Sequence, residues 1–334
     1  MARLTQAIKT LTRLTTLSTR VLAGAGSATA FVQRPPTYTV PVLSVTAGYF
    51  GGGVDSVSNI SGIDKITFPE DSKTTLAATL TTARGSTGGM ANCMVAGYFG
   101  GGLDVGLISG IDKITFNADT KTTLSATLTT ARQQLAGMAN SGVAGYFGGG
   151  SDSVGNISGI DKITFPADSK TTLGATLTSA RANLAAMANS GVAGYFGGGG
   201  TNGIDKITFP ADSKTTLSAT LTSSNYSFAG MANSGVAGYF GGGENGGFLN
   251  RIDKITFPAD SKTTLGATLT YACYNLAGMA DSGVAGYFGG GYGPSANRNE
   301  INKITFPTDS QALISATLTT ARYSPTGMAN GGIV

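Results

Sequence analysis

Short stretches in which apolar and polar residues alternate recur along this chain, separated by clusters of Gly, Ser, Asn, Asp and Pro. The alternation is clearest where Leu124, Ala126 and Leu128 would share one face of an extended chain and Thr and Ser the other. A period of two residues predicts β-strands. Four such segments make up one unit, for example 111–116 (IDKITF), 123–129 (TLSATLT), 135–140 (LAGMAN) and 143–149 (VAGYFGG).

This unit occurs six times. The tyrosine of its GYF element recurs every 44 to 49 residues, at Tyr49, Tyr98, Tyr146, Tyr195, Tyr239 and Tyr287. A fixed period in this range indicates a solenoid or a propeller, and four antiparallel strands per copy favour the propeller. We predict an all-β, six-bladed β-propeller over residues 37–334, preceded by a short helical or extended arm at residues 1–36.

The two ends of the repeat region complement each other. The last copy runs through GMANGGIV to Val334, where a seventh GYF element would begin, and the first copy lacks a GMAN segment ahead of Tyr49. Pairing residues 327–334 beside residues 47–52 would complete the first blade and remove two open sheet edges. In a competing register Val40–Leu43 form the inner strand, but Pro41 has no N–H for a paired position. We therefore predict closure by a C-terminal strand.

Composition agrees with a tightly turned β-protein. The 334 residues include 51 glycines, and only 12% are charged. This composition does not fit a disordered chain. Cys93 and Cys273 stand at different places in their repeats, which argues against a disulfide framework. No apolar run reaches the roughly 18 residues of a membrane span, so none is expected.

Positive charge is concentrated near the N-terminus. Residues 1–44 hold five Arg or Lys residues and no acid, whereas the remaining 17 basic and 18 acidic residues leave the repeats near neutral. A near-neutral body gives nucleic-acid binding little support, so we expect no nucleic-acid partner.

The N-terminal arm has an apolar stripe at helical spacing, and AGAGSA (23–28) followed by RPP (34–36) predicts a linker to the propeller. Three interpretations stay open: a helix that oligomerises or docks on a larger body, a transit or membrane-surface segment, and a frayed tail. We favour docking. The expected docking residues are Arg3, Leu4, Ile8, Leu11, Arg13 and Leu14.

The repeats resemble two known families. A double glycine after an aromatic-ended strand, an acidic strand, an outer strand and an Arg-ended segment leading to a small-residue strand resemble the kelch repeat over residues 42–334. The chain departs from that pattern because it has no Trp, and Leu76 and Leu124 occupy the place where kelch repeats often carry one. The GYFGGG and GMANSG elements are also similar to kelch-like structural proteins of tailed phages of marine cyanobacteria. That likeness implies a virion protein.

Enzyme chemistry is not expected, and no cofactor or metal is predicted. The chain has no histidine, which excludes a Ser-His triad and imidazole ligands, including those of the copper site of galactose oxidase, a propeller of this repeat type. Asp64, Asp112, Asp161 and two equivalents recur, but each precedes a lysine and the sixth site is Asn302. Strand and turn structure explain such repetition better than one catalytic centre. The GGG elements end strands and do not open helices, which disfavours phosphate binding.

Variation between copies is confined to two loops. We label the predicted strands a (GMAN), b (GYFGG), c (IDKITF) and d (ATLT). Alternating direction then places the b–c and d–a loops on one rim, and these differ between copies. After the Arg position of the d–a loop stand Gly85, Gln133 and Ala182 in the first three copies, but Tyr226, Tyr274 and Tyr323 in the last three. We predict that these tyrosines form one arc.

Exposed aromatic rings near Asn and Arg suit stacking on a sugar or a protein, although rings that merely cover the core are the alternative. The predicted binding residues are Tyr226, Tyr274, Tyr323, Tyr271, Tyr292, Phe248, Asn250 and Arg251. Arg84, Arg132, Arg181 and Arg322 are expected to tether neighbouring loops.

The sequence thus predicts a non-enzymatic interaction module located on a virion, such as a fibre, tail or capsid-attached protein. The expected partners are other virion proteins, contacted through the arm within an oligomer or larger assembly, and a host-surface glycan or protein contacted by the variable rim. The alternative is a free carbohydrate-binding or cellular kelch-type scaffold protein in the cytoplasm.

Overall fold

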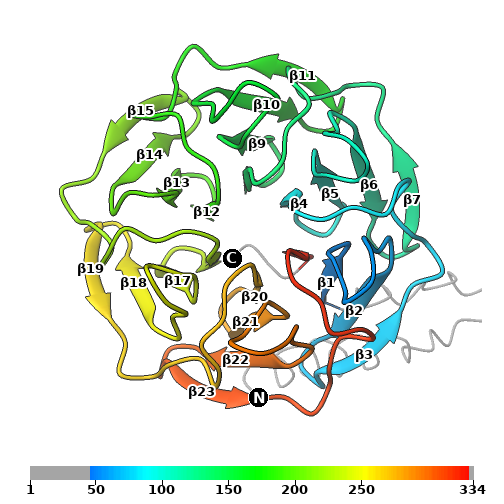
Figure 1. The fold of residues 1–334 in the computed structure, drawn as a ribbon. Helices are drawn as coiled ribbons and strands as arrows, with labels where there is room; N and C mark the ends of the chain where they lie inside the picture. Colours follow the sequence, from blue (N-terminus) through cyan, green and yellow to red (C-terminus); the bar gives the residue numbers. More distant parts are fainter. Residues whose placement is uncertain (1–45, 331–334) are drawn as a thin grey trace, which may run out of the picture. The chain divides into compact units, whose positions relative to one another are not determined.

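The computed structural model describes residues 46–330 and confirms the six-bladed, all-β propeller (Figure 1). Each blade is a sheet of four antiparallel strands, with strand a nearest the axis and strand d at the periphery. Blade 1 has the order β24-β1-β2-β3, and blades 2 to 6 follow in chain order from β4 to β23. The predicted arm and the competing segment Val40–Leu43 lie outside the described residues.

Each class of strand has nearly constant bounds. The a strands are β24 (Thr326–Ala329), β4 (Gly88–Asn92), β8 (Ala136–Asn140), β12 (Leu184–Asn189), β16 (Ala229–Asn233) and β20 (Ala277–Asp281). The b strands are β1 (Ala47–Gly51), β5 (Ala96–Gly100), β9 (Ala144–Gly148), β13 (Ala193–Gly198), β17 (Ala237–Gly241) and β21 (Ala285–Gly289). The c strands are β2 (Ile63–Thr67), β6 (Ile111–Thr115), β10 (Ile160–Thr164), β14 (Ile204–Thr208), β18 (Ile252–Thr256) and β22 (Ile301–Thr305). The d strands are β3 (Ser72–Thr75), β7 (Thr120–Thr123), β11 (Ser169–Thr172), β15 (Ser213–Thr216), β19 (Ser261–Thr264) and β23 (Ser310–Leu313).

The outer strand is not the one that the alternation pattern predicted. The SKTT segment forms strand d, and residues 124–129 of the predicted TLSATLT strand lie outside any strand. The turn after strand c is so short that Thr115 already pairs with Thr120. The chain then leaves the sheet toward the next blade, and the buried Leu128 packs into the core.

Closure by the C-terminal strand is confirmed. Strand β24 pairs antiparallel with β1, from Gly48 opposite Ala329 to Gly51 opposite Thr326. Asn330 continues the contact, since its N–H donates to the carbonyl oxygen of Ala47 and its Oδ1 accepts the N–H of that residue. Both the first and the last described strand therefore lie inside one sheet.

Small residues let the a strands meet around the axis. A Cβ added at Gly137 would clash with the backbone of Gly89 in the preceding blade, and one at Gly278 would clash with that of Gly230. The equivalent position of blade 4 is Ala186, the one place where the ring admits a methyl group. This close approach of backbones explains the glycine of the GMAN motif.

The other repeated apolar residues interlock neighbouring blades. Met90 of blade 2 packs onto Gly145 of blade 3, so that no Cβ would fit there. In the opposite direction Phe99 of blade 2 fills the space over Gly51 of blade 1. Each glycine of the GYFG strand is thus a hole for a side chain of an adjacent blade. Six similar core clusters result, one at each junction between blades.

The tyrosine and lysine of the repeat meet at the turn between strands c and d. The hydroxyl of buried Tyr49 donates to Asp119 of the next blade at 2.9 Å, and the ammonium of Lys65 pairs with the same carboxylate at 2.7 Å. Asp119 has a left-handed backbone (φ 51°), which aspartate tolerates well. The contact recurs at every junction, and Lys303 with Asp71 closes the ring at 2.6 Å. The turn aspartates therefore connect blades.

Candidate functional site

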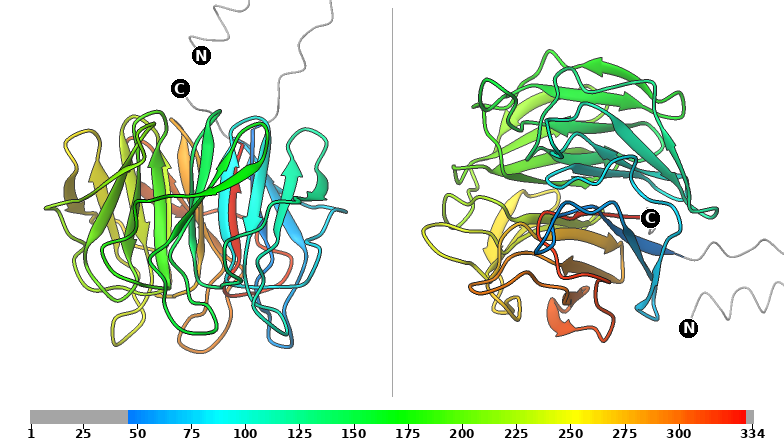
Figure 2. Two further views of the ribbon diagram at one scale, coloured as in Figure 1. Left: turned by 90° about the horizontal axis from the view of Figure 1, so that it is seen from above. Right: turned by 45° about the vertical axis from the view of Figure 1, so that its right-hand side comes forward.

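The propeller has two chemically different rims. The turn rim carries the short a–b and c–d turns, and the loop rim carries the b–c and d–a loops, which extend further from the sheets (Figure 2). In five of the six blades, the residue after the glycine run pairs on the loop rim with the d–a loop of the preceding blade, whereas Thr201 of blade 4 pairs with Asn225 of its own d–a loop. Val54 and Tyr323 exchange two backbone hydrogen bonds of 2.8 and 3.0 Å, as do Tyr274 and Tyr292 at 3.1 and 2.8 Å. Backbone pairing thus fixes the positions from which both loops present their side chains.

Four aromatic rings gather on the loop rim of blades 5, 6 and 1, and we call them the four-ring cluster. Phe248 stacks on Tyr274 with centroids 5.4 Å apart, and Tyr274 lies 5.6 Å from Tyr292. Tyr292 in turn meets Tyr323 edge-on at 6.2 Å. The rings are partly exposed, and burial together with the Glu244 carboxylate raises the pKa of Tyr274. The cluster is a continuous, uncharged aromatic surface.

The other predicted site residues lie outside this cluster. Tyr226 is 43% exposed, lies over Gly200, and has no stacking partner within residues 46–330. Tyr271 is covered by the guanidinium of Arg298, 4.3 Å from the ring centroid. Asn250 is exposed. The predicted arc of three tyrosines therefore becomes a cluster in which Tyr292 joins Tyr274 to Tyr323, while Tyr226 stands apart.

Arg251 is engaged in contacts within the fold. Its Nη2 donates to Ser223 Oγ at 2.5 Å and to Asn225 Oδ1 at 2.9 Å, and its Nε lies 3.9 Å from Asp253 Oδ2. Asn225 occupies the d–a loop position where four other copies have arginine. Arg251 therefore supplies a guanidinium from the opposite loop.

A groove of about 500 Å³ lies beside Tyr292 and Tyr323, at the junction of blades 6 and 1. Its lining consists of Asp55, Ser56, Tyr292, Ser295, Ala296, Asn297, Thr320, Ala321 and Tyr323. These residues come from three loops that are distant in sequence. Apart from the two tyrosines, the sequence analysis singled out none of them, because the repeat pattern does not show how irregular loops of different blades face one another.

Asp55 presents a fixed carboxylate at this groove. Its Oδ1 accepts the N–H groups of Val57 and Ser58 at 2.7 and 2.8 Å, while Oδ2 has no partner among residues 46–330. These backbone hydrogen bonds, from Ser58 first and Val57 second, lower the pKa of Asp55. The carboxylate is therefore charged at neutral pH and can accept hydrogen bonds. The D-x-x-S spacing of the loop was the available sequence signal for this turn.

The recurring aspartates of strand c have structural partners. Asp161 Oδ2 accepts from the N–H of Thr129 at 2.9 Å and from Arg132 Nη2 at 3.1 Å, and Thr172 donates to Oδ1 at 2.9 Å. Burial alone would raise the pKa of Asp161, but the hydrogen bonds from Thr129 and the Arg132 charge outweigh it, so the pKa is lowered. The d–a loop of one blade is thereby tied to strand c of the next.

The buried ion pair is present at four junctions, a half-buried Arg251 approaches Asp253 at the junction of blades 4 and 5, and the junction of blades 5 and 6 has no arginine–aspartate pair among the described residues. Between blades 5 and 6, Cys273 stands in place of the arginine, Asn302 in place of the aspartate and Gln311 in place of the strand-d lysine. Asn302 Oδ1 accepts from the N–H of Thr270 at 2.9 Å and from Gln311 Nε2 at 2.7 Å. Three charged positions have become neutral together, and hydrogen bonding is kept. Three rings of the four-ring cluster, those of Phe248, Tyr274 and Tyr292, lie at this junction.

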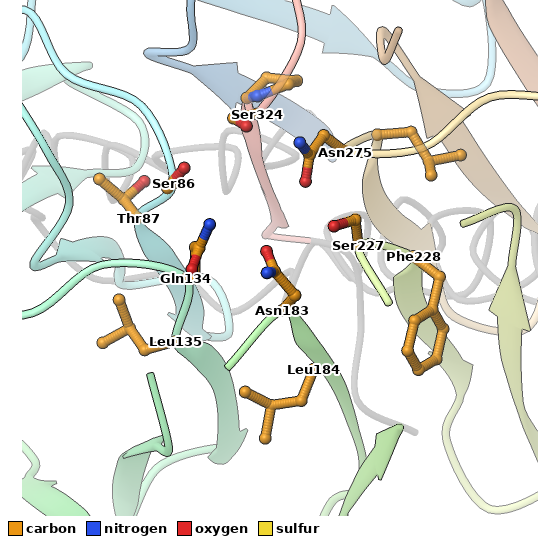
Figure 3. A pocket seen from close by; sticks show the side chains of 12 residues that line it. Ser86, Thr87, Gln134, Leu135, Asn183, Leu184, Ser227, Phe228, Asn275 and Ser324 are labelled. Carbon is orange, nitrogen blue, oxygen red and sulfur yellow. The ribbon is translucent and has the colours of Figure 1, made fainter. Parts of the chain in front are cut away.

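Six short polar side chains surround the axis on the loop rim (Figure 3). They are Ser86, Gln134, Asn183, Ser227, Asn275 and Ser324. All have left-handed backbones (φ 52° to 57°), and each N–H donates to the carbonyl of its neighbour in the preceding blade, which closes a ring of hydrogen bonds of 2.5–3.2 Å. The hollow measures about 80 Å³. Such an uncharged ring can hydrogen-bond a small polar group, and the sequence analysis missed it.

The described residues offer little other reactive chemistry. Within residues 46–330 no three His, Cys, Asp or Glu side chains are grouped as metal ligands. Cys93 and Cys273 are not disulfide-bonded, and burial raises the pKa of Cys273 to about 12. In the same part of the chain no helix is long and apolar enough to cross a membrane.

The predicted docking residues of the arm lie outside the described residues. Comparison with models of known protein families and with curated proteins found no match. The likeness to kelch repeats and to phage structural proteins therefore depends on the sequence motifs alone.

Proposed function

We propose that this chain is a non-enzymatic interaction module that serves as a structural component of a tailed-phage virion, for example a fibre, tail or capsid-attached protein. It docks on the particle through residues 1–36 and presents the loop rim for binding to a host-surface glycan or protein.

The observation that carries this proposal is the four-ring cluster. Binding residues are disproportionately carried on loops positioned by a rigid scaffold, and a partly exposed aromatic surface is typical of interaction sites. The aromatic side chains of the d–a loops occur only in the last three copies, and the equivalent positions in the first three copies are Gly85, Gln133 and Ala182. The first three copies fold without aromatic rings at those positions, so the rings are not a general requirement of the repeat.

The non-enzymatic part of the proposal is supported by the contacts that the polar groups make. The chain has no histidine, and the repeated aspartates are occupied by threonine, arginine, lysine and tyrosine partners. The virion part is supported by the GYFGGG and GMANSG likeness and by the basic, apolar-striped arm, which has no counterpart in the near-neutral repeats.

Particle composition tests the virion role. We expect mass spectrometry of purified particles to detect the full chain, and we expect deletion of residues 1–36 to abolish its incorporation. Normal incorporation without the arm would refute docking. For recognition, replacing Tyr274, Tyr292 and Tyr323 together by Ala is expected to abolish binding to host cells, while Gln133→Ala on the opposite arc is expected to leave it unchanged.

The groove beside Tyr292 favours a second candidate, a free carbohydrate-binding or kelch-type scaffold protein of the cytoplasm. Absence of the chain from particles, combined with retained ligand binding by the loop rim, would favour this alternative.

A further inference from the structure

We infer that the groove between blades 6 and 1 binds a neutral saccharide, with a sugar ring stacked on Tyr292 and Tyr323 and its hydroxyl groups hydrogen-bonded to Asp55 and Asn297. This inference rests on the proposed function, because it assigns a ligand class to the loop rim. It goes further in naming the groove, the contacts and the charge selectivity.

The two tyrosines form adjoining walls that are already in place. Their centroids are 6.2 Å apart and their planes meet at 76°. Tyr292 is supported from behind by Tyr274 and Phe248, and Tyr323 is held by its backbone pairing with Val54. Such preorganised rings lose little entropy on binding. A pyranose has a C–H face that packs on an aromatic face and an equator of hydroxyl groups, so an angled aromatic corner matches it.

The rest of the lining suits hydroxyl groups. Asp55 is held by two backbone N–H groups at Oδ1 and leaves Oδ2 without a partner among the described residues. A carboxylate accepts strong hydrogen bonds from O–H donors. Asn297 adds an amide, and Ser56, Ser295 and Thr320 add hydroxyls. The volume of about 500 Å³ is suited to a small saccharide.

Charge decides between neutral and acidic sugars. None of the nine lining residues is cationic, and Asp55 is anionic. The nearby Arg322 is buried and its Nη2 pairs with Asp64 Oδ2 at 2.8 Å. Arg298 stacks on Tyr271 and lies 3.8 Å from Glu300. A uronic or sialic acid would therefore place a carboxylate near Asp55 with no available counter-charge, which favours a neutral hexose.

The test uses the full chain and ligand-observed saturation-transfer NMR with titration. The probes are the methyl pyranosides of glucose, galactose and mannose, with methyl glucuronide and N-acetylneuraminic acid as acidic comparisons. We expect at least one neutral glycoside to bind and the acidic sugars to bind at least tenfold more weakly.

Substitutions taken from equivalent positions of other repeats are expected to leave the fold intact. Tyr323→Gln introduces the residue that stands at position 133, and Tyr292→Ser introduces the residue at position 151. Each is expected to weaken saccharide binding by about tenfold or more, as loss of an aromatic anchor does. Asp55→Asn is expected to reduce the difference in binding affinity between neutral and acidic sugars. Gln133→Ala should leave binding unchanged.

Binding of no neutral saccharide overturns the inference, as does preferential binding of an acidic sugar or equal binding by Tyr323→Gln. If host cells or a host protein still bind the loop rim in a tyrosine-dependent way without any saccharide, the proposed function stands and the saccharide assignment is wrong. If tyrosine-dependent host binding is also absent, the proposed recognition role fails too.

Discussion

Replacement of Arg132 by Cys tests how the blades are joined, because the chain has made the equivalent change itself at Cys273. Arg132 and Asp161 are both buried, at 2% and 1% side-chain exposure, and their side chains are 3.1 Å apart. Loss of one partner leaves a buried carboxylate without its counter-charge, which typically costs about 3–5 kcal/mol. Asp161 keeps its Thr129 and Thr172 donors, and Lys170 lies 3.7 Å away. We therefore expect Arg132→Cys to lower the free energy of unfolding by about 3 kcal/mol, the lower end of this range.

The neutral junction between blades 5 and 6 supplies the compensating changes. Combining Arg132→Cys with Asp161→Asn and Lys170→Gln should recover all but about 1 kcal/mol, because burying a neutral amide costs far less than burying an unpaired charge. The amide would accept from Thr129 as Asn302 does from Thr270. The native pair also has a cost, since the buried Nε of Arg132 has no hydrogen-bond partner within residues 46–330.

Urea denaturation at pH 7, followed by far-UV circular dichroism, measures both free energies without adding salt that would screen the charges. A cost below about 1 kcal/mol for Arg132→Cys would refute the reasoning. A triple variant no more stable than Arg132→Cys alone would refute it as well. Gln133→Ala, one residue away on the loop surface, serves as the neutral control.

Three further predictions concern the fold. Deleting residues 326–334 removes β24 and exposes the edge of β1, so the free energy of unfolding should fall by at least about 4 kcal/mol. Urea denaturation measures this loss and aggregation is a second readout; an unchanged denaturation midpoint would reject closure by β24. Gly137→Ala should lower the free energy of unfolding by about 3 kcal/mol, because the new methyl group would meet the backbone of Gly89. Gly106→Ala should be near neutral because no atom lies within 4 Å of the added Cβ, and equal losses in the two variants would contradict the close packing at the axis. Because the pKa of Asp161 is lowered in the folded protein, its contribution to folding stability is complete above the unfolded-state pKa of about 3.9 and is lost as the pH falls through the folded-state pKa. The free energy of unfolding should therefore fall less between pH 5 and pH 2 in Asp161→Asn than in the unaltered protein, and identical pH profiles would contradict this assignment.

Sequence periodicity predicted the architecture well because each repeat is a nearly independent measurement of the same strand pattern. The ring closure was equally accessible, since residues 47–51 lack a partner that residues 326–329 provide. Strand d was predicted wrongly. The segment 124–129 has the alternation of a strand, but it is a loop whose apolar side chains pack into the core between two blades. A period of two residues alone does not distinguish a paired strand from such an extended loop.

The candidate site was only partly predictable. Equivalent positions in consecutive blades identified Tyr274 and Tyr323 as members of one surface. Repetition also indicated structural partners for the strand-c aspartates, and the structure shows such partners for Asp161. The groove was not predicted because its lining comes from three loops, and the repeat pattern does not determine how the side chains of irregular loops face one another. The role of Arg251 was also hidden, since nothing in a repeat alignment indicates that it replaces the arginine missing at Asn225.

The position of the four-ring cluster suggests that its covering and binding roles are compatible. At the junction of blades 5 and 6 the Arg–Asp tether is absent, and Tyr274 packs there between Phe248 and Tyr292. At the junction of blades 6 and 1 the tether persists as Arg322 and Asp64, so Tyr323 is not needed to hold the loop. The rings of the first junction therefore stabilise the loops, whereas Tyr323 is available to a ligand.

This argument predicts different effects for two chemically identical substitutions. Tyr274→Ala removes two ring contacts and should cost about 1–3 kcal/mol in urea denaturation, while Tyr323→Ala removes one and should cost less than about 1.5 kcal/mol. For ligand binding the order should reverse, since Tyr323 lines the groove and Tyr274 does not. Equal stability costs for the two variants would show that the aromatic rings do not substitute for the missing tether. A larger binding defect in Tyr274→Ala than in Tyr323→Ala would place recognition on the other side of Tyr292.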